Sequence, residues 1–298
     1  MKGSVVALII VGTVALTIGG ICFGVGLHNK AANDKVIENR YDITDAFENI
    51  DIDLETADLY IKKSNDTSVK VECNEREKLY QDVKVESGSL KIKTIDQRRW
   101  YEKYIFAFNF KRFDVTVYLP TATYNNLKAK TATGDVNFEE GFTFSSANVK
   151  TSTGNINYQS TVSESLELRS DTGNIKAENF AAKNASIRTS TGNITVEDVT
   201  VTEILTTNSS TGNHRLTRTT AAKIDIHAST GNVNFNSCDA SESIKVKTST
   251  GDIKGTLLTG KTFSAHSGTG SVRVPDPTIG APLCQLESST GRIDISIA

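Results

Sequence analysis

The hexapeptide Thr-Ser-Thr-Gly-Asn-Ile at residues 151–156 returns unchanged at 189–194 and as Thr-Ser-Thr-Gly-Asp-Ile at 248–253. Its Thr-Gly pair occurs nine times in the C-terminal two-thirds of the chain, at intervals of 19 to 21 residues, with the glycine at Gly134, Gly154, Gly173, Gly192, Gly212, Gly231, Gly251, Gly270 and Gly291. A fixed period of this length is typical of a solenoid, in which each repeat buries its apolar residues by stacking on its neighbours.

Apolar and polar residues alternate on both sides of each glycine. Positions seven and five before it, and two and four after it, are mostly Leu, Ile, Val or Ala. Period-2 alternation is typical of half-buried strands, so each repeat is predicted to hold two strands. The parity changes at the glycine: positions seven, five, three and one before it are expected to point inward, and then positions two and four after it. Such a corner suits glycine, which reaches positive φ without steric cost.

These patterns predict an all-β fold, a single-stranded parallel β-solenoid (β-helix-like) of about nine coils. Identical Thr and Asn side chains are expected to lie about 4.8 Å apart along the stack and to hydrogen-bond there. His214 and Cys284 stand in columns that are otherwise apolar. The chain also ends without an obvious polar cap, so Ile295 and Ile297 could leave an exposed edge that pairs with another molecule.

The chain before the repeats divides into three parts. Residues 5–27 carry no charge and are mostly apolar, which is long enough for one transmembrane helix; a cleaved secretory signal is the alternative. We expect a single-pass protein of the cell membrane with its repeats outside the cytoplasm. The predicted organisation is an N-terminal transmembrane signal-anchor, a linker, a divergent N-terminal β cap with an aromatic insertion, and the regular solenoid, at residues 1–27, 28–46, 47–120 and 121–298.

Composition argues against several classes of function. The formal net charge is −2 with charges of both signs well mixed, so nothing points to nucleic acid. The four cysteines are scattered, without a CxxC or a His/Cys cluster, so we expect neither a metal nor another cofactor; a single disulfide stays possible.

Catalysis has little support in the sequence. Polysaccharide-active β-solenoid enzymes need carboxylates gathered on one face, whereas the outward columns here hold mainly Asn, Thr, Lys and Ser. The four histidines are scattered. We expect no catalytic residues, and such an enzyme remains a remote alternative.

One outward column is rich in cations. It lies four residues before each glycine and includes Lys130, Lys150, Arg169, Arg188, His227, Lys247 and His266. A neighbouring outward column, three residues after the glycine, is expected to add Lys176, Arg215, Lys254 and Arg273. Stacked cations repel unless an anion compensates them, so this surface is a candidate site for an anionic envelope polymer or anionic lipid headgroups. The alternative is a solvated face whose repulsion is relieved by Glu167 and Asp225.

An aromatic insertion at residues 100–113 interrupts the alternation. Trp100, Tyr101, Tyr104 and Phe106 stand among Arg and Lys residues and could contact a partner protein, a sugar or the membrane interface. The alternative is that Phe106, Phe108 and Phe110 form one face of a cap strand.

The recurring Thr-x-Thr motif raises the question of ice binding. That function would need both hydroxyls on an exposed flat sheet. The predicted parity places both threonines inside, so we expect an internal threonine ladder instead.

Three groups of motifs together carry a family resemblance. The start Phe47-Glu48-Asn49-Ile50-Asp51-Ile52, the stretch Val115-Thr116-Val117-Tyr118-Leu119-Pro120 and the Thr-Gly-Asn/Asp-Ile/Val corners resemble the bacterial putative-adhesin family of β-strand-repeat domains of unknown function, which includes LiaG-like membrane-anchored envelope proteins. The resemblance covers approximately residues 40–298. It implies a membrane-anchored envelope protein, often associated with envelope stress, and supplies no catalytic residues.

The expected function is therefore non-enzymatic binding or scaffolding in the cell envelope. The alternative is an accessory or sensor protein of the envelope-stress response that acts through a membrane-protein partner.

Overall fold

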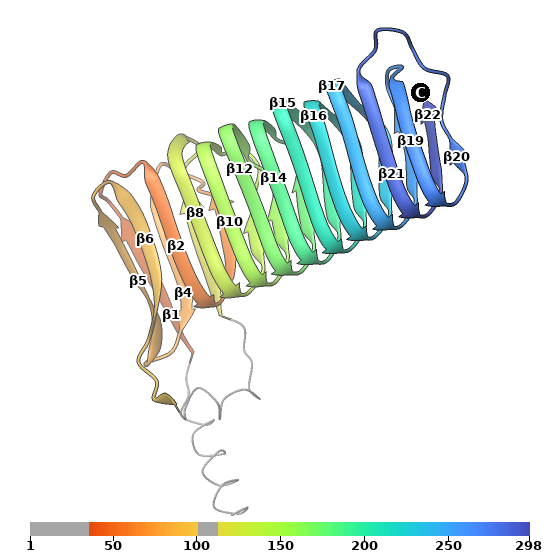
Figure 1. Cartoon of the computed structure of the whole chain (residues 1–298). Helices are drawn as coiled ribbons and strands as arrows, with labels where there is room; N and C mark the ends of the chain where they lie inside the picture. Colours follow the sequence, from red (N-terminus) through yellow and green to blue (C-terminus); the bar gives the residue numbers. More distant parts are fainter. Residues whose placement is uncertain (1–35, 101–112) are drawn as a thin grey trace, which may run out of the picture.

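The computed structural model describes residues 36–100 and 113–298, and this part of the chain is an all-β solenoid (Figure 1). No helix among these residues is long and apolar enough to cross a membrane. The predicted span at residues 5–27 lies outside the described residues, as do Tyr101, Tyr104, Phe106, Phe108 and Phe110.

Each coil contributes to two facing walls of parallel strands. In stacking order, the long-strand wall contains β2 (Asn49–Thr56), β8 (Thr123–Thr133), β10 (Thr143–Thr153), β12 (Thr161–Thr172) and β14 (Ala181–Thr191). The short-strand wall contains β3 (Asp58–Lys63), β9 (Val136–Phe138), β11 (Ile156–Tyr158) and β13 (Ile175–Glu178). The next three strands run through both walls: β15 (Ile194–Thr211), β16 (His214–Thr230) and β17 (Val233–Thr250).

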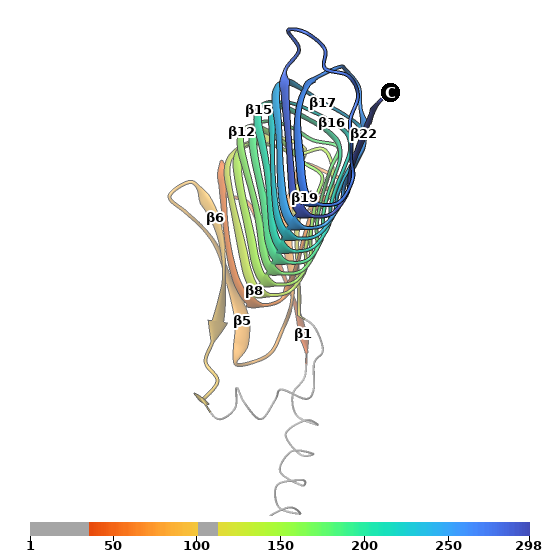
Figure 2. The same ribbon diagram turned by 45° about the vertical axis from the view of Figure 1, so that its right-hand side comes forward.

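The walls meet at the Thr-Gly corners and separate toward the opposite edge, as the view in Figure 2 shows. Aromatic rings fill the wider side of the first coils, where the ring centroids of Phe138 and Tyr158 lie 5.2 Å apart. At the opposite edge the chain turns back six residues after the corner glycine. The turning residue has positive φ although it is not glycine in four coils, at Asn179, Asp198, Arg218 and Ser237.

Antiparallel strands cover the N-terminal end. On the long-strand wall, β6 (Ser89–Asp96) pairs with β2, and β5 (Leu79–Glu86) pairs antiparallel with β6. On the short-strand wall, β7 (Asp114–Leu119) pairs with β3, β4 (Val69–Glu75) runs antiparallel to β7, and β1 (Ile37–Ile43) is the edge strand. The strands β2 and β3 form a coil of their own, with Ala57 at the glycine position.

The C-terminal end is not stacked in sequence order. The strands β21 (Leu283–Thr290) and β22 (Ile293–Ile297) lie directly on β17 and β18 (Ile253–Leu257). The earlier strands β19 (Thr262–Thr269) and β20 (Val272–Arg273) form the outer edge beyond them. The expectation that Ile295 and Ile297 leave an exposed edge is therefore wrong, because β22 is inserted between β18 and β20, and Ile295 is buried.

Candidate functional site

Backbone packing explains the glycine at each corner. All nine corner glycines have φ between 149° and 159°. A Cβ on Gly154 would lie 1.9 Å from the carbonyl oxygen of Gly134 in the preceding coil, and the other corners are as tight. Only glycine fits both the dihedral angle and the contact. These nine residues therefore act as structural corners of the coil.

Two hydrogen-bond ladders hold the corners in line. In the first, the residue after the glycine uses its side-chain oxygen to accept the backbone N–H of its counterpart in the next coil, as from Asn174 N to Asn155 Oδ1 at 2.9 Å. This asparagine ladder runs unbroken from Asp58 to Arg292. In the second, a buried hydroxyl three residues before the glycine donates to the preceding coil's glycine carbonyl, as from Thr151 Oγ1 to Gly134 O at 3.1 Å.

The threonine directly before each glycine was expected to point inward, and this is wrong. Thr131 and Thr151 are buried, but Thr133 and Thr153 are exposed. The reason is that the corner begins before the glycine, because the glycine itself must face the preceding carbonyl. One hydroxyl of each Thr-x-Thr motif is therefore bonded inside the stack, and the other faces solvent.

The structure brings the cation column together on the outer face of the long-strand wall. Register pairs Lys130 with Lys150, Lys150 with Arg169, and Arg169 with Arg188, so four cations lie on consecutive strands. His227 and Lys247 continue the row on β16 and β17. His266 is separated from Lys247 by Glu287, since β21 lies between their strands.

Carboxylates compensate much of this charge. The nearest N to O distances are 3.8 Å for Lys130 with Asp53, 3.2 Å for Lys150 with Glu167, 3.1 Å for Arg169 with Asp171 and 3.1 Å for Lys247 with Glu287. Glu167 thus relieves repulsion as expected, whereas Asp225 makes no ion pair among the described residues. The column three residues after the glycine, with Lys176, Arg215, Lys254 and Arg273, belongs to the other wall and does not enlarge the patch.

The outer face of the short-strand wall carries two open grooves. The first, of about 440 Å³, lies over β3, β9, β11 and β13 and is lined by residues that include Tyr60, Asn137, Asn157, Gln159, Lys176 and Glu178. The second, of about 400 Å³, lies over β15, β16 and β17 and is lined mainly by Asn193, Thr195, Asn213, Arg215, Asn232 and Asn234. Sequence reasoning missed these grooves, although the recurrence of Asn one and three residues after the glycine was a usable signal.

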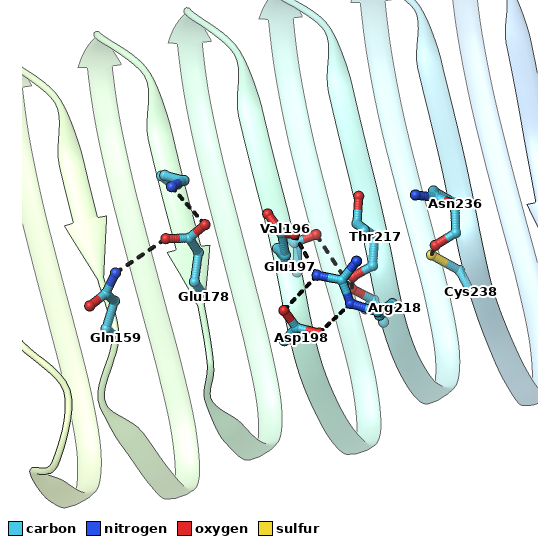
Figure 3. A network of polar contacts seen from close by, with 11 residues as sticks. Gln159, Glu178, Val196, Glu197, Asp198, Thr217, Arg218, Asn236 and Cys238 are labelled. Atoms are coloured by element: carbon cyan, nitrogen blue, oxygen red, sulfur yellow. Dashed lines mark hydrogen bonds and ion pairs between the residues drawn. The ribbon is translucent and has the colours of Figure 1, made fainter.

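Polar contacts between neighbouring coils order the short-strand wall (Figure 3). Gln159 Nε2 donates to Glu178 Oε2 at 3.2 Å, and Lys176 Nζ pairs with Glu178 Oε1 at 2.7 Å. Further along, the Arg218 guanidinium donates to both carboxylate oxygens of Asp198, at 2.6 and 2.7 Å. These contacts join side chains about 20 residues apart in sequence.

Comparison with known proteins identifies the family. The family model described as Toastrack DUF4097 matches residues 47–210 and 186–298, which together span most of the chain. The chain belongs to the Toastrack DUF4097 family. This confirms the resemblance to a putative-adhesin β-repeat domain of unknown function. A search of curated proteins finds no match.

Solved structures with the same fold cover nearly the whole Toastrack chain. A putative lipid binding protein from Parabacteroides distasonis is 18% identical, with a TM-score of 0.54, and covers 87% of this chain and 97% of its own. A putative adhesin from the same species is 15% identical, with a TM-score of 0.52, and covers 88% and 97%. At these identities the likeness shows the fold alone.

His214 lies in an arrangement that resembles a catalytic one. Its Nε2 is 2.7 Å from Ser209 Oγ, and its Nδ1 is 2.8 Å from Thr207 Oγ1. All three side chains are buried, and His214 is 0% exposed, so no substrate can reach them. Burial, aided by the nearby His227, lowers the pKa of His214 to about 4, so the ring is neutral at pH 7. The Toastrack chain thus holds a hydrogen-bonded core histidine here.

Metal and thiol chemistry have no visible site in the described part of the chain. No group of three or more His, Cys, Asp or Glu residues there could hold a metal ion. Cys73, Cys238 and Cys284 are buried thiols that are not joined to one another by a disulfide. Burial raises the pKa of Cys284 to about 12, so its reactive thiolate form is suppressed.

Of the aromatic contact candidates, only Trp100 is described, and 75% of its surface is exposed. It follows β6, whose end pairs with the start of β5. Ile37, the first residue of β1 and 44% exposed, pairs with Glu75 at the end of β4. A tight turn joins β4 to β5, so Trp100 and Ile37 lie at the same end of the N-terminal strands.

Proposed function

We propose that this Toastrack chain is a non-enzymatic binding module of the bacterial cell envelope that uses the outer faces of its solenoid to hold an extended polymer. The observation that carries the proposal is the strict register of outward columns, which the corner ladders maintain from β2 to β21. A rigid row of repeated side chains suits a repeating ligand, because each ligand unit meets the same chemistry without any ordering cost to the protein.

The first ligand class is an anionic envelope polymer on the cation column. The four consecutive cations Lys130, Lys150, Arg169 and Arg188 support it. Their carboxylate partners compete with an external anion, so affinity is expected to be modest and to fall as salt rises.

The location of the module rests on the sequence. The uncharged apolar segment at residues 5–27 supports a single-pass anchor in the cell membrane, with the solenoid on the extracytoplasmic side.

The test is co-sedimentation of the purified full-length chain, kept in mild detergent, with isolated cell walls and with anionic vesicles across a salt series. Changing Lys150, Arg169, Arg188 and Lys247 to Glu should abolish salt-sensitive binding. The matched control is Glu167→Gln with Asp171→Asn, which removes two competing carboxylates and should strengthen binding several-fold. If neither variant changes sedimentation, the cation column is solvated surface.

A second candidate is an accessory or sensor role through a membrane-protein partner. It is favoured by exposed Trp100 and Ile37 at one end of the N-terminal strands. Deleting residues 101–112 together with Trp100→Ser should then abolish crosslinking to membrane proteins in cells, whereas the Lys and Arg to Glu changes should leave it intact.

A further inference from the structure

We propose that the outer face of the short-strand wall is a binding site for an uncharged polysaccharide strand, laid along the solenoid axis across β9, β11 and β13 and on toward β17. The inference rests on the proposed role as a binding module. It assigns a different ligand class to the wall opposite the cation column.

The two grooves lie on one line across successive strands. Register pairs Asn137 with Asn157, Asn157 with Lys176, and Lys176 with Thr195. The same column continues through Arg215 to Asn234 in the second groove. Because parallel strands are spaced about 4.8 Å apart, this column offers a polar side chain at intervals comparable to the length of one pyranose unit.

The groove residues have the chemistry that sugar hydroxyls require. A side-chain amide offers two N–H donors and a carbonyl acceptor, and a hydroxyl needs both kinds of partner. Asn157 Nδ2 donates to Asn137 Oδ1 at 2.7 Å, which orients both amides and uses only part of their capacity. Gln159 is oriented in the same way by Glu178. The amides are thus positioned before a ligand arrives, which lowers the entropic cost of binding.

The charges of this face are matched within it, which argues for an uncharged ligand. Lys176 pairs with Glu178 at 2.7 Å, and Lys254 pairs with Asp252 at 2.6 Å. Glu197 pairs with Arg218 at 2.5 Å. An anionic chain would meet Glu139, Glu178 and Glu197 along one edge of the grooves, so the polyanion candidate fits the opposite wall better.

The experiment titrates the detergent-solubilised full-length chain by calorimetry with three neutral probes, chitohexaose, cellohexaose and laminarihexaose, and with polyphosphate as the anionic probe. At least one neutral hexasaccharide should bind. The variant Asn157→Arg on β11 should weaken that binding at least tenfold, because a long cation then fills the groove. Asn148→Arg, the same change on β10 of the same coil, lies on the opposite wall and should change the affinity less than twofold.

Each outcome decides the inference. Thermal melting first verifies that both variants fold, and Gln159→Ala replaces Asn157→Arg if that variant does not. Absence of binding to all three hexasaccharides, binding to polyphosphate alone, or equal effects of the two arginine variants would overturn the inference. The proposed function is judged separately by sedimentation with cell walls: if walls still retain the chain while every neutral hexasaccharide fails, the binding module stands and this glycan site does not.

Discussion

The carbonyl of Gly251 faces Gly291, not the next corner glycine in the sequence. A Cβ on Gly291 would lie 2.0 Å from that oxygen, while Gly270 packs on the far side of Gly291. The last two repeats therefore exchange places: the ninth fills a slot between the seventh and the eighth. As a result, β19 obtains its ladder partner only from a strand that follows it in the chain.

Deleting residues 283–298 should therefore expose more than the deleted strands. Without β21 and β22, the strands β19 and β20 lose the neighbours to which their backbones bond. We expect their amide hydrogens to exchange with solvent at least a hundredfold faster, measured by hydrogen exchange with mass spectrometry. Leu283→Ser, at a side chain 47% exposed, is the control and should leave the exchange unchanged. Retained protection after the deletion would show that β19 can stack directly on β17.

The substitution Gly192→Ala should be severely destabilising. The φ of Gly192 is 149°, and the new Cβ would lie 2.1 Å from Gly173 O. Backbone strain and overpacking together should lower the free energy of unfolding by about 3 kcal/mol or more. Gly280→Ala isolates the dihedral cost, because φ is 78° there and nothing lies within 4 Å of the added Cβ; about 1 kcal/mol is expected. Urea denaturation compares the two, and equal losses would contradict the packing argument.

The asparagine ladder predicts a difference between two substitutions of one residue. Asn193 accepts the backbone N–H of Asn213 at 2.9 Å. Asn193→Ala removes that acceptor and should cost about 1 kcal/mol. Asn193→Asp keeps the acceptor, as Asp135 and Asp252 do at equivalent corners, and should cost less than half as much. Chemical denaturation of both variants measures the difference; a larger loss for Asp than for Ala would argue against the ladder.

Stability should fall in mild acid because of His214. Its pKa is about 4 in the folded chain, below the ordinary value of 6.5, so between these values the unfolded chain binds more protons. The free energy of unfolding should therefore decrease as pH falls from 6.5 to 4, by about 3 kcal/mol at the lower end from this group. Melting temperatures across that range test the slope.

The control for this pH dependence is His214→Val with Thr207→Val. The double variant places valine in both core columns, and Ser209 can then donate to the Gly192 carbonyl, as Thr189 does to Gly173. The slope between pH 6.5 and 4 should become shallower. An unchanged slope would mean that other groups dominate.

The sequence alone determined the coil. The Thr-Gly period and the alternation around it predicted the parallel β-solenoid, its corners and the asparagine ladder, because in a stacked fold each residue meets its own equivalent and local pattern becomes long-range contact. It also predicted the cation row, since residues in one repeat column must share a face.

Tertiary structure decided what periodicity cannot express. A repeat carries no information on which neighbour it stacks against, so the exchange of the last two coils was not predictable from near-identical corners. Nor does the alternation say how two strand faces are oriented after the corner, and for that reason Lys176 was assigned to the cation surface and the grooves beside Asn157 were missed. Ion pairs such as Lys150 with Glu167 depend on side-chain geometry between strands, so the charge that the row presents to a ligand is fixed only when the coils pack.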